Sequence, residues 1–149
     1  MTPKLPVSVL VVVHTPALEV LLLERAARPG YWQSVTGSLD RADEPPMEAA
    51  QREVREETGI EAALARLRDW HLTYTFEIYP QWRHRFAPGT THNTEHVFGL
   101  ELPERAAVTL APDEHTAYLW LPWREAAQKC FSWSNRDAIR QLAPRGAPR

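Results

Sequence analysis

Three glutamates, Glu53, Glu56 and Glu57, are spaced so that a helix would carry them on one face. Each helical residue turns about 100°, which makes positions i, i+3 and i+4 neighbours. Three like charges held together repel one another and destabilise the helix. A bound cation removes that repulsion, and carboxylate oxygens at this density suit Mg²⁺ together with water and substrate phosphates. The spacing predicts a metal site for phosphate chemistry, with Glu53 and Glu57 as ligands and Glu56 as a ligand or a base.

The alternative interpretation of this segment is an exposed charged face that binds nothing. Arg52 would then pair with Glu56 at i,i+4, and Arg55 would offset the charges beside it. In the metal-site interpretation, Arg52 orients a glutamate and does not contact the substrate.

The helix that carries the glutamates is predicted to begin at Pro45-Pro46, where a missing N–H is tolerated, and to run to Thr58. Gly59 follows as a C-terminal cap. Met47, Ala50 and Val54 form an apolar stripe about a quarter turn away from the carboxylates. One side of the helix can therefore be buried while the other faces a cleft.

The remaining elements are predicted from apolar periodicity and turn residues. The predicted strands are Val7–Val13, Val20–Leu23, Leu72–Tyr79, Glu95–Leu102 and Ala117–Leu121, and Trp32–Thr36 is a short extended piece leading into Gly37. Two closing helices are expected at Trp123–Cys130 and Asn135–Leu142, the second with a capping box of Ser134 and Asp137. Residues 83–93 are expected to form a loop rich in Arg, His, Thr and Asn.

Length and composition predict one globular domain over residues 1–149, with a frayed tail at 144–149. The net charge of −2 argues against a general nucleic-acid binder. The single cysteine, Cys130, excludes an internal disulfide and a cysteine-rich zinc site, which suits a reducing compartment. No apolar segment approaches membrane-spanning length. A cytoplasmic protein without a membrane partner is expected, whose oligomeric state the sequence leaves open.

The segment from Gly37 to Ile60 resembles the Nudix box: a glycine, a spaced glutamate, then Arg-Glu-apolar-x-Glu-Glu-x-Gly-apolar. Residues 52–60 match the second part at every position, and this match favours the metal site over the exposed charged face. One departure lies upstream. Six residues separate Gly37 from Glu44 where the family usually has five, and Asp43 keeps that spacing. We interpret this as one extra residue in the loop before the helix.

The resemblance implies an α/β Nudix fold, an α/β/α sandwich with a mixed β-sheet and a central catalytic helix. It also implies Mg²⁺ as cofactor, with Mn²⁺ as a substitute, and attack by water that breaks a phosphoanhydride bond. Bound metal would neutralise the polyphosphate and lower the pKa of a water.

A narrower resemblance comes from blocks outside the box, namely 6–13, 31–38, 83–95 and 132–136. They are similar to one Nudix subfamily, the dihydroneopterin triphosphate pyrophosphatases, also known as dATP pyrophosphohydrolases. This implies conversion of dihydroneopterin triphosphate to the monophosphate with release of pyrophosphate, a step of folate biosynthesis. Nucleoside triphosphates such as dATP are the expected secondary substrates.

Carried over position by position, the subfamily pattern makes Glu114 a third metal ligand and catalytic residue beside Glu53 and Glu57. It also implies a set of substrate contacts: Lys4, Arg25, Thr36, Phe76, Glu77, Ile78, Tyr79 and Ser132.

Several of these residues have simpler interpretations. The resemblance implies that the planar guanidinium of Arg25 binds phosphate, but Arg25 could instead lay its aliphatic stem over the sheet surface and keep its charge in water. Phe76 and Tyr79 could pack in the core, and Ser132 could hold a local turn.

Two other functions fit the same fold. One is a Nudix pyrophosphohydrolase acting on other nucleoside triphosphates or on RNA 5′ ends, the latter disfavoured because no basic stripe is present. The other is a non-catalytic module that senses a nucleotide. Such a module would be expected to have lost carboxylates, whereas all three helical ones are present.

Overall fold

A computed structural model describes residues 2–144. The predicted tail at 144–149 lies outside the described residues except for Pro144. The sheet is built around β1 (Val7–His14), whose valines favour extended backbone because their branched side chains pack well on a pleated surface. Val9 and Val11–Val13 are fully buried. Burial of each such side chain stabilises the fold by about 1.5–3 kcal/mol.

Within residues 2–144, seven strands form one mixed sheet in the order β3-β2-β1-β6-β5, with β4 paired to β1 and β7 paired to β2. The β1–β6 pair is parallel and the other pairs are antiparallel. The bounds are β2 (Glu19–Arg25), β3 (Trp32–Gln33), β4 (Val35–Ser38), β5 (Leu67–Glu77), β6 (His92–Glu101) and β7 (His115–Pro122). β1 pairs with β4 over Ser8–Val11 and meets β2 at His14.

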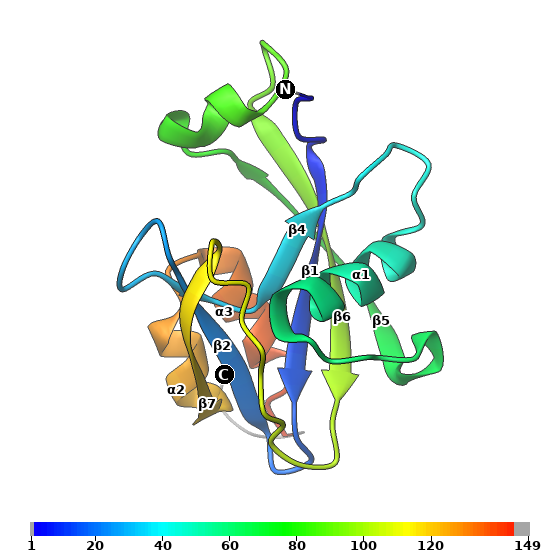
Figure 1. The fold of residues 1–149 in the computed structure, drawn as a ribbon, viewed down its shortest axis with the longest axis vertical. Helices are drawn as coiled ribbons and strands as arrows, with labels where there is room; N and C mark the ends of the chain where they lie inside the picture. Colours follow the sequence, from blue (N-terminus) through cyan, green and yellow to red (C-terminus); the bar gives the residue numbers. More distant parts are fainter. Residues whose placement is uncertain (1, 145–149) are drawn as a thin grey trace.

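Helices cover both faces of this sheet (Figure 1). On one face α1 (Pro46–Thr58) packs its alanines and Val54 against the odd-numbered valines of β1. On the other face α2 (Trp123–Lys129) and α3 (Trp133–Arg140) pack against Leu10 and Val12. The predicted α/β/α sandwich with a mixed sheet is confirmed.

The helix α1 begins and ends where the sequence predicts. Pro46 lies in its first turn, and Gly59 follows with φ 74°, a left-handed conformation that glycine adopts without strain. The buried residues of α1 include Glu53 and Glu57 as well as apolar side chains. A helix that buries two carboxylates has a reason other than packing to keep them.

Several predicted boundaries are wrong. The segment Trp32–Thr36 is divided between β3 (Trp32–Gln33) and β4 (Val35–Ser38). β5 begins at Leu67, five residues before the predicted start, because an irregularity between Asp69 and Leu72 interrupts its alternation. His71 has φ 53° there. α3 begins at Trp133, and its cap is Ser132, whose hydroxyl accepts a hydrogen bond from Asn135 N–H. Ser134 and Asp137 do not form the predicted capping box.

The segment predicted as a loop at 83–93 is only partly irregular. Residues Pro80–Arg85 form the 3₁₀ helix η2, and β6 already begins at His92. A second short 3₁₀ helix, η1 (Leu64–Arg66), precedes β5. No helix among residues 2–144 combines the length and the apolar character needed to cross a membrane.

Candidate metal and phosphate site

Gly37 on β4 and Glu53 on α1 touch so closely that any side chain at position 37 would displace the Glu53 carboxylate. A Cβ atom added to Gly37 would lie 2.2 Å from Cδ of Glu53. The glycine at the start of the motif therefore makes room for a carboxylate from its helical part. This contact places Glu53 against the sheet, 9% exposed.

Glu57 lies one turn further along α1 and meets Glu114, in the turn before β7, and His115, the first residue of β7. Atoms of Glu57, Glu114 and His115 all lie within 4.8 Å of one another, so these three side chains can hold a metal ion. Glu57 is 1% exposed, yet neither of its oxygens has a hydrogen-bond partner among the described residues. A buried carboxylate without donors is expensive unless a cation binds it. The donor set therefore fits a divalent cation.

The electrostatics of the two buried glutamates support the same interpretation. Burial raises the pKa of Glu57 well above its ordinary value, and the nearby Glu53 and Glu114 raise it further. Burial likewise raises the pKa of Glu53, while the Arg52 guanidinium, which donates a hydrogen bond to it, opposes the rise. A divalent cation would reverse this effect, because it stabilises the ionised form of both groups.

Arg52 joins the loop before α1 to the helix and orients the glutamates. Its guanidinium donates to both oxygens of Glu44 at 3.1 Å each and to Glu53 Oε1 at 2.8 Å. It also donates to the carbonyl of Ser38 and reaches Glu56 at 3.3 Å. Glu56 is half exposed and lies outside the three-residue group that can hold a metal. The predicted role of Arg52, orienting a glutamate, agrees with this geometry.

The extra loop residue is accommodated before Glu44. Glu44 is buried, 7% exposed, and accepts hydrogen bonds from Arg52 and from Asp40 N–H. Asp43 is exposed and pairs only with Arg41 among the described residues. Hydrogen bonding to Arg52 lowers the pKa of Glu44. Glu44, and not Asp43, therefore fastens the loop to α1.

Two predicted substrate contacts, Lys4 and Arg25, bring positive charge to the carboxylates. Loss of surrounding water lowers the pKa of Lys4, as do Arg85 and Arg25, while Glu53 and Glu114 raise it. Burial and Arg85 lower the pKa of Arg25, and Glu57 and Glu114 raise it. These cations repel one another, and a polyanion bound between them would relieve that repulsion.

A row of polar side chains leads from Arg25 toward the carboxylates through Gln33 and His115, two residues absent from the predicted set. Arg25 Nη1 donates to Gln33 Oε1 at 3.2 Å, which turns the Gln33 amide N–H toward His115 Nε2 at 3.4 Å. That nitrogen lies 3.7 Å from Glu57 Oε1. Burial, with Arg25, lowers the pKa of His115 to about 4, so its imidazole is neutral at pH 7. The position of His115 directly after Glu114 was the one sequence signal for it.

The other predicted substrate contacts are spread around the site. The Thr36 hydroxyl donates to the carbonyl of Val9, and Glu77 pairs with Arg83 at 2.6 Å. Ile78 is buried and Phe76 packs at the edge of the core beneath α3. Tyr79 is 43% exposed. Ser132 caps α3, as its turn interpretation predicts.

An aromatic cluster around Trp82 is a second feature outside the predicted set. Its ring lies 5.2 Å from that of Tyr79 and 6.1 Å from that of Phe131, both edge-on. The guanidinium of Arg25 stands 4.9 Å from the Trp82 ring centre. The cluster holds Arg25 in place by cation–π contact. It depends on the 3₁₀ helix η2, which periodicity in the sequence does not reveal.

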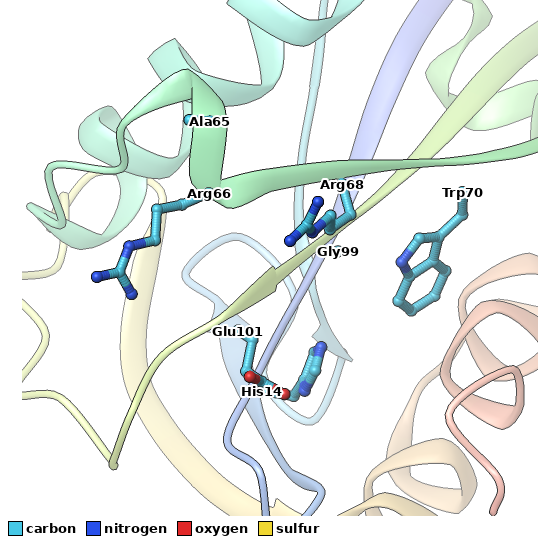
Figure 2. A pocket seen from close by; sticks show the side chains of 7 residues that line it. All are labelled: His14, Ala65, Arg66, Arg68, Trp70, Gly99 and Glu101. Carbon is cyan, nitrogen blue, oxygen red and sulfur yellow. The ribbon is translucent and has the colours of Figure 1, made fainter.

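An open cavity of about 490 Å³ lies at the opposite end of the sheet, where β1 and β6 end at His14 and Glu101. Figure 2 shows Trp70 on one side of it and Arg66 on the other. Glu101 is its only carboxylate, and two arginines line it. It lacks the clustered carboxylates that a metal site requires, so the phosphate chemistry belongs to the first site.

Comparison with known proteins places nearly the whole chain in one family. Residues 4–142 match the NUDIX domain. The chain is 45% identical over 142 residues to the dihydroneopterin triphosphate diphosphatase of Escherichia coli K12, covering 93% of each chain. It is 36% identical over 137 residues to the enzyme of that name from Haemophilus influenzae, covering 90% of this chain and 85% of the relative.

Comparison with solved structures gives the same result as comparison of the sequences. The E. coli dihydroneopterin triphosphate pyrophosphohydrolase superposes with a TM-score of 0.88 at 44% identity, covering 95% of this chain and 97% of that one. A NUDIX hydrolase from Listeria monocytogenes shares the fold, with a TM-score of 0.75 at 23% identity over 93% and 92% of the two chains. The chain belongs to the NUDIX domain family and is a Nudix hydrolase.

Proposed function

We propose that this protein is a Mg²⁺-dependent pyrophosphohydrolase that converts dihydroneopterin triphosphate to the monophosphate and pyrophosphate. The observation that carries the reaction class is the convergence of Glu53, Glu57 and Glu114 with the cations Lys4 and Arg25 at one end of the sheet. The substrate is inferred from the two relatives, whose names state it and which align with nearly the whole chain. Other nucleoside triphosphates, dATP among them, are secondary substrates.

In this proposal Glu57, Glu114 and Glu53 hold the metal, and Glu56 stands beside them as a further ligand or base. Mg²⁺ is proposed, with Mn²⁺ as a substitute, because hard oxygen donors dominate the group. When bound, the ion neutralises phosphate charge and acidifies water. Side chains of the protein bind the phosphates and orient the metal ligands. Lys4 and Arg25 hold the phosphates, and Arg52 keeps Glu53 in its orientation.

Hydrolysis then needs a base near the phosphorus. Glu56 and Glu114 are both exposed, so either can accept a proton from the attacking water. The oxygen of that water forms a new P–O bond while the P–O bond between the α and β phosphates breaks. The electron pair of the broken bond stays with the group that leaves, which is pyrophosphate after attack at the α phosphorus and the monophosphate after attack at the β phosphorus. Attack at the α or the β phosphorus gives the same products.

The same site in a single domain serves a small molecule better than a nucleic acid. The net charge of −2 and the absence of a basic stripe disfavour RNA 5′ ends as substrates. A non-catalytic sensing module is disfavoured because all three helical carboxylates are present and Glu57 lies beside Glu114.

The test is pyrophosphate release from a panel of dihydroneopterin triphosphate, the nucleoside triphosphates, nucleoside diphosphate sugars and 5′-triphosphorylated RNA. We expect the highest kcat/KM for the pterin compound and a lower value for dATP. Efficient turnover of another compound with none of the pterin would contradict the proposed substrate. Absence of turnover for every compound with Mg²⁺ or Mn²⁺ would favour the sensing module.

A further inference from the structure

Asn93 and Glu95 form a buried polar pair at the start of β6 that the phosphate chemistry does not use. Both side chains lie on the sheet face covered by α2 and α3, together with Ser8 of the adjacent β1. Their exposed fractions are 6%, 5% and 6%. The neighbouring positions on this face, Leu10 and Val97, are apolar. Polar side chains at such positions need an explanation.

Each of the two side chains has one oxygen that lacks a hydrogen-bond donor among the described residues. Asn93 Nδ2 donates to Ser8 Oγ at 2.8 Å, which leaves Asn93 Oδ1 without a partner. Ser134 of α3 hydrogen-bonds the Glu95 carboxyl, but Glu95 Oε1 is unpartnered. Burial raises the pKa of Glu95 to about 7. Two acceptors side by side, two residues apart on one strand face, are therefore both short of donors.

Aromatic side chains from β5 stand directly opposite this pair. Tyr74 is paired in register with Glu95, and Phe76 with Asn93. Tyr74 is fixed, because its hydroxyl donates to Asp137 and its ring meets that of Trp133 edge-on at 5.4 Å. Phe76 is less buried and is one of the proposed substrate contacts. Aromatic rings beside a few unpartnered acceptors are the kind of lining that binds a polar heterocycle.

We propose that Glu95 and Asn93 bind the heterocycle of the substrate through an edge that presents adjacent N–H donors, as the 2-amino-4-oxopyrimidine half of a dihydropterin does. A carboxylate accepts two parallel N–H bonds, and the amide oxygen of Asn93 accepts a further one. Adenine presents one amino group beside a ring acceptor and fills fewer of these oxygens. Glu95 and Asn93 thus become the specificity-determining residues. This inference rests on the proposed function.

The position of the pair relative to the phosphates fits a substrate of this length. β6, β1 and β4 are consecutive neighbours, so two strand spacings, about 10 Å, separate Glu95 from Gly37. In the described sheet β4 pairs only with β1, which leaves its other edge without a strand. An extended triphosphate can pass this edge, with its ring on the α3 face and its phosphates on the α1 face.

The first test compares substrates in the Glu95→Gln variant. The amide keeps the size of the side chain but replaces one acceptor with a donor that opposes the N–H groups of the ring. We expect kcat/KM for dihydroneopterin triphosphate to fall about 10- to 100-fold, and that for dATP to change much less. Glu101→Gln, the same substitution at an exposed end of β6, is the matched control and should leave both values unchanged.

The second test needs neither phosphate nor metal. Fluorescence titration with unphosphorylated dihydroneopterin in the presence of a chelator should show equal binding by the wild type and Glu57→Gln, and weaker binding by Glu95→Gln and by Asn93→Ala. Asn93→Ala carries the test if Glu95→Gln does not fold. Unchanged ring binding and unchanged substrate preference in both variants would overturn the inference while leaving the proposed function intact. A wild type inactive on the pterin compound would instead contradict the proposed function.

Discussion

At the scale of single residues, the proposed hydrolysis and ring binding depend on two buried carboxyl groups on opposite faces of the sheet. Glu57 belongs to the proposed metal site, and Glu95 belongs to the proposed binding site for the ring. Glu57 faces Glu114 and His115 without a hydrogen-bond donor, and Glu95 faces the underside of α3 with one oxygen unfilled. Each group destabilises the free protein because it is buried without full compensation. Ligand binding is therefore expected to stabilise the folded protein at each position, through a cation at Glu57 and a heterocycle at Glu95.

The Glu57→Gln variant tests the first of these. Loss of a metal-binding carboxylate should lower kcat by more than about 100-fold, which exceeds the loss typical for a residue that only hydrogen-bonds a metal ligand. Added Mg²⁺ should raise the unfolding temperature of the wild type, because it binds only the folded state, and should not raise that of the variant. The matched control is Glu48→Gln on the exposed side of α1. Equal stabilisation of Glu57→Gln by Mg²⁺ would remove Glu57 from the metal site.

The Glu95→Gln variant should also change how stability depends on pH. Burial raises the pKa of Glu95 from 4.5 to about 7. Between these values the folded protein keeps a proton that the unfolded chain has released, so this carboxyl destabilises the fold increasingly as pH rises through the window. We expect the variant to be more stable than the wild type by about 3 kcal/mol at pH 8 and by nothing below pH 4.5. Urea unfolding at both pH values measures this, and a difference independent of pH would contradict it.

At the scale of elements, the site depends on how closely α1 approaches β4. The approach is set by Gly37, since a Cβ there would overlap the Glu53 carboxyl. It is held by Arg52, which joins Glu44 and the carbonyl of Ser38 to the helix. The motif therefore supplies the metal-binding glutamates and also positions them, because its glycine allows the close approach of α1 and its arginine holds the helix there.

A pair of glycine variants separates placement from packing. Gly37→Ala should displace Glu53 and lower kcat about 10- to 100-fold, as loss of ligand orientation does. Gly99→Ala is the matched control, since its Cβ would overlap Trp70 at 2.5 Å in the distant cavity. It should lower the unfolding temperature and change tryptophan fluorescence while kcat stays normal. Normal activity in Gly37→Ala would show that Glu53 does not need this position.

The parts of the site that follow helical spacing could be predicted from the sequence, and the parts that depend on strand pairing could not. The spacing of Glu53 and Glu57 and the glycine at position 59 locate α1 and its carboxylates. Gln33 and His115 lie 82 residues apart and meet only because β2 pairs with both β3 and β7. No local pattern carries that information. The start of β5 was hidden for a related reason, since the left-handed His71 breaks its alternation.

At the scale of the whole molecule, the sheet separates the proposed metal site from the proposed binding site for the ring. The α1 face holds the carboxylates, the α3 face holds the acceptors for the ring, and Lys4 and Arg25 bring positive charge to the carboxylates at the same end of the sheet. The opposite end carries the cavity lined by Arg66, Arg68 and Trp70 and has no part in the reaction proposed. This division predicts that ring recognition and phosphate hydrolysis can be impaired independently.

The most direct test of the central claim is the ³¹P NMR spectrum of dihydroneopterin triphosphate during incubation with the protein and Mg²⁺. The account predicts that the triphosphate signals disappear while a phosphate monoester and pyrophosphate appear in equal amounts, with no orthophosphate. Release of orthophosphate with a diphosphate product, or an unchanged spectrum at a protein concentration that hydrolyses another triphosphate, would contradict it.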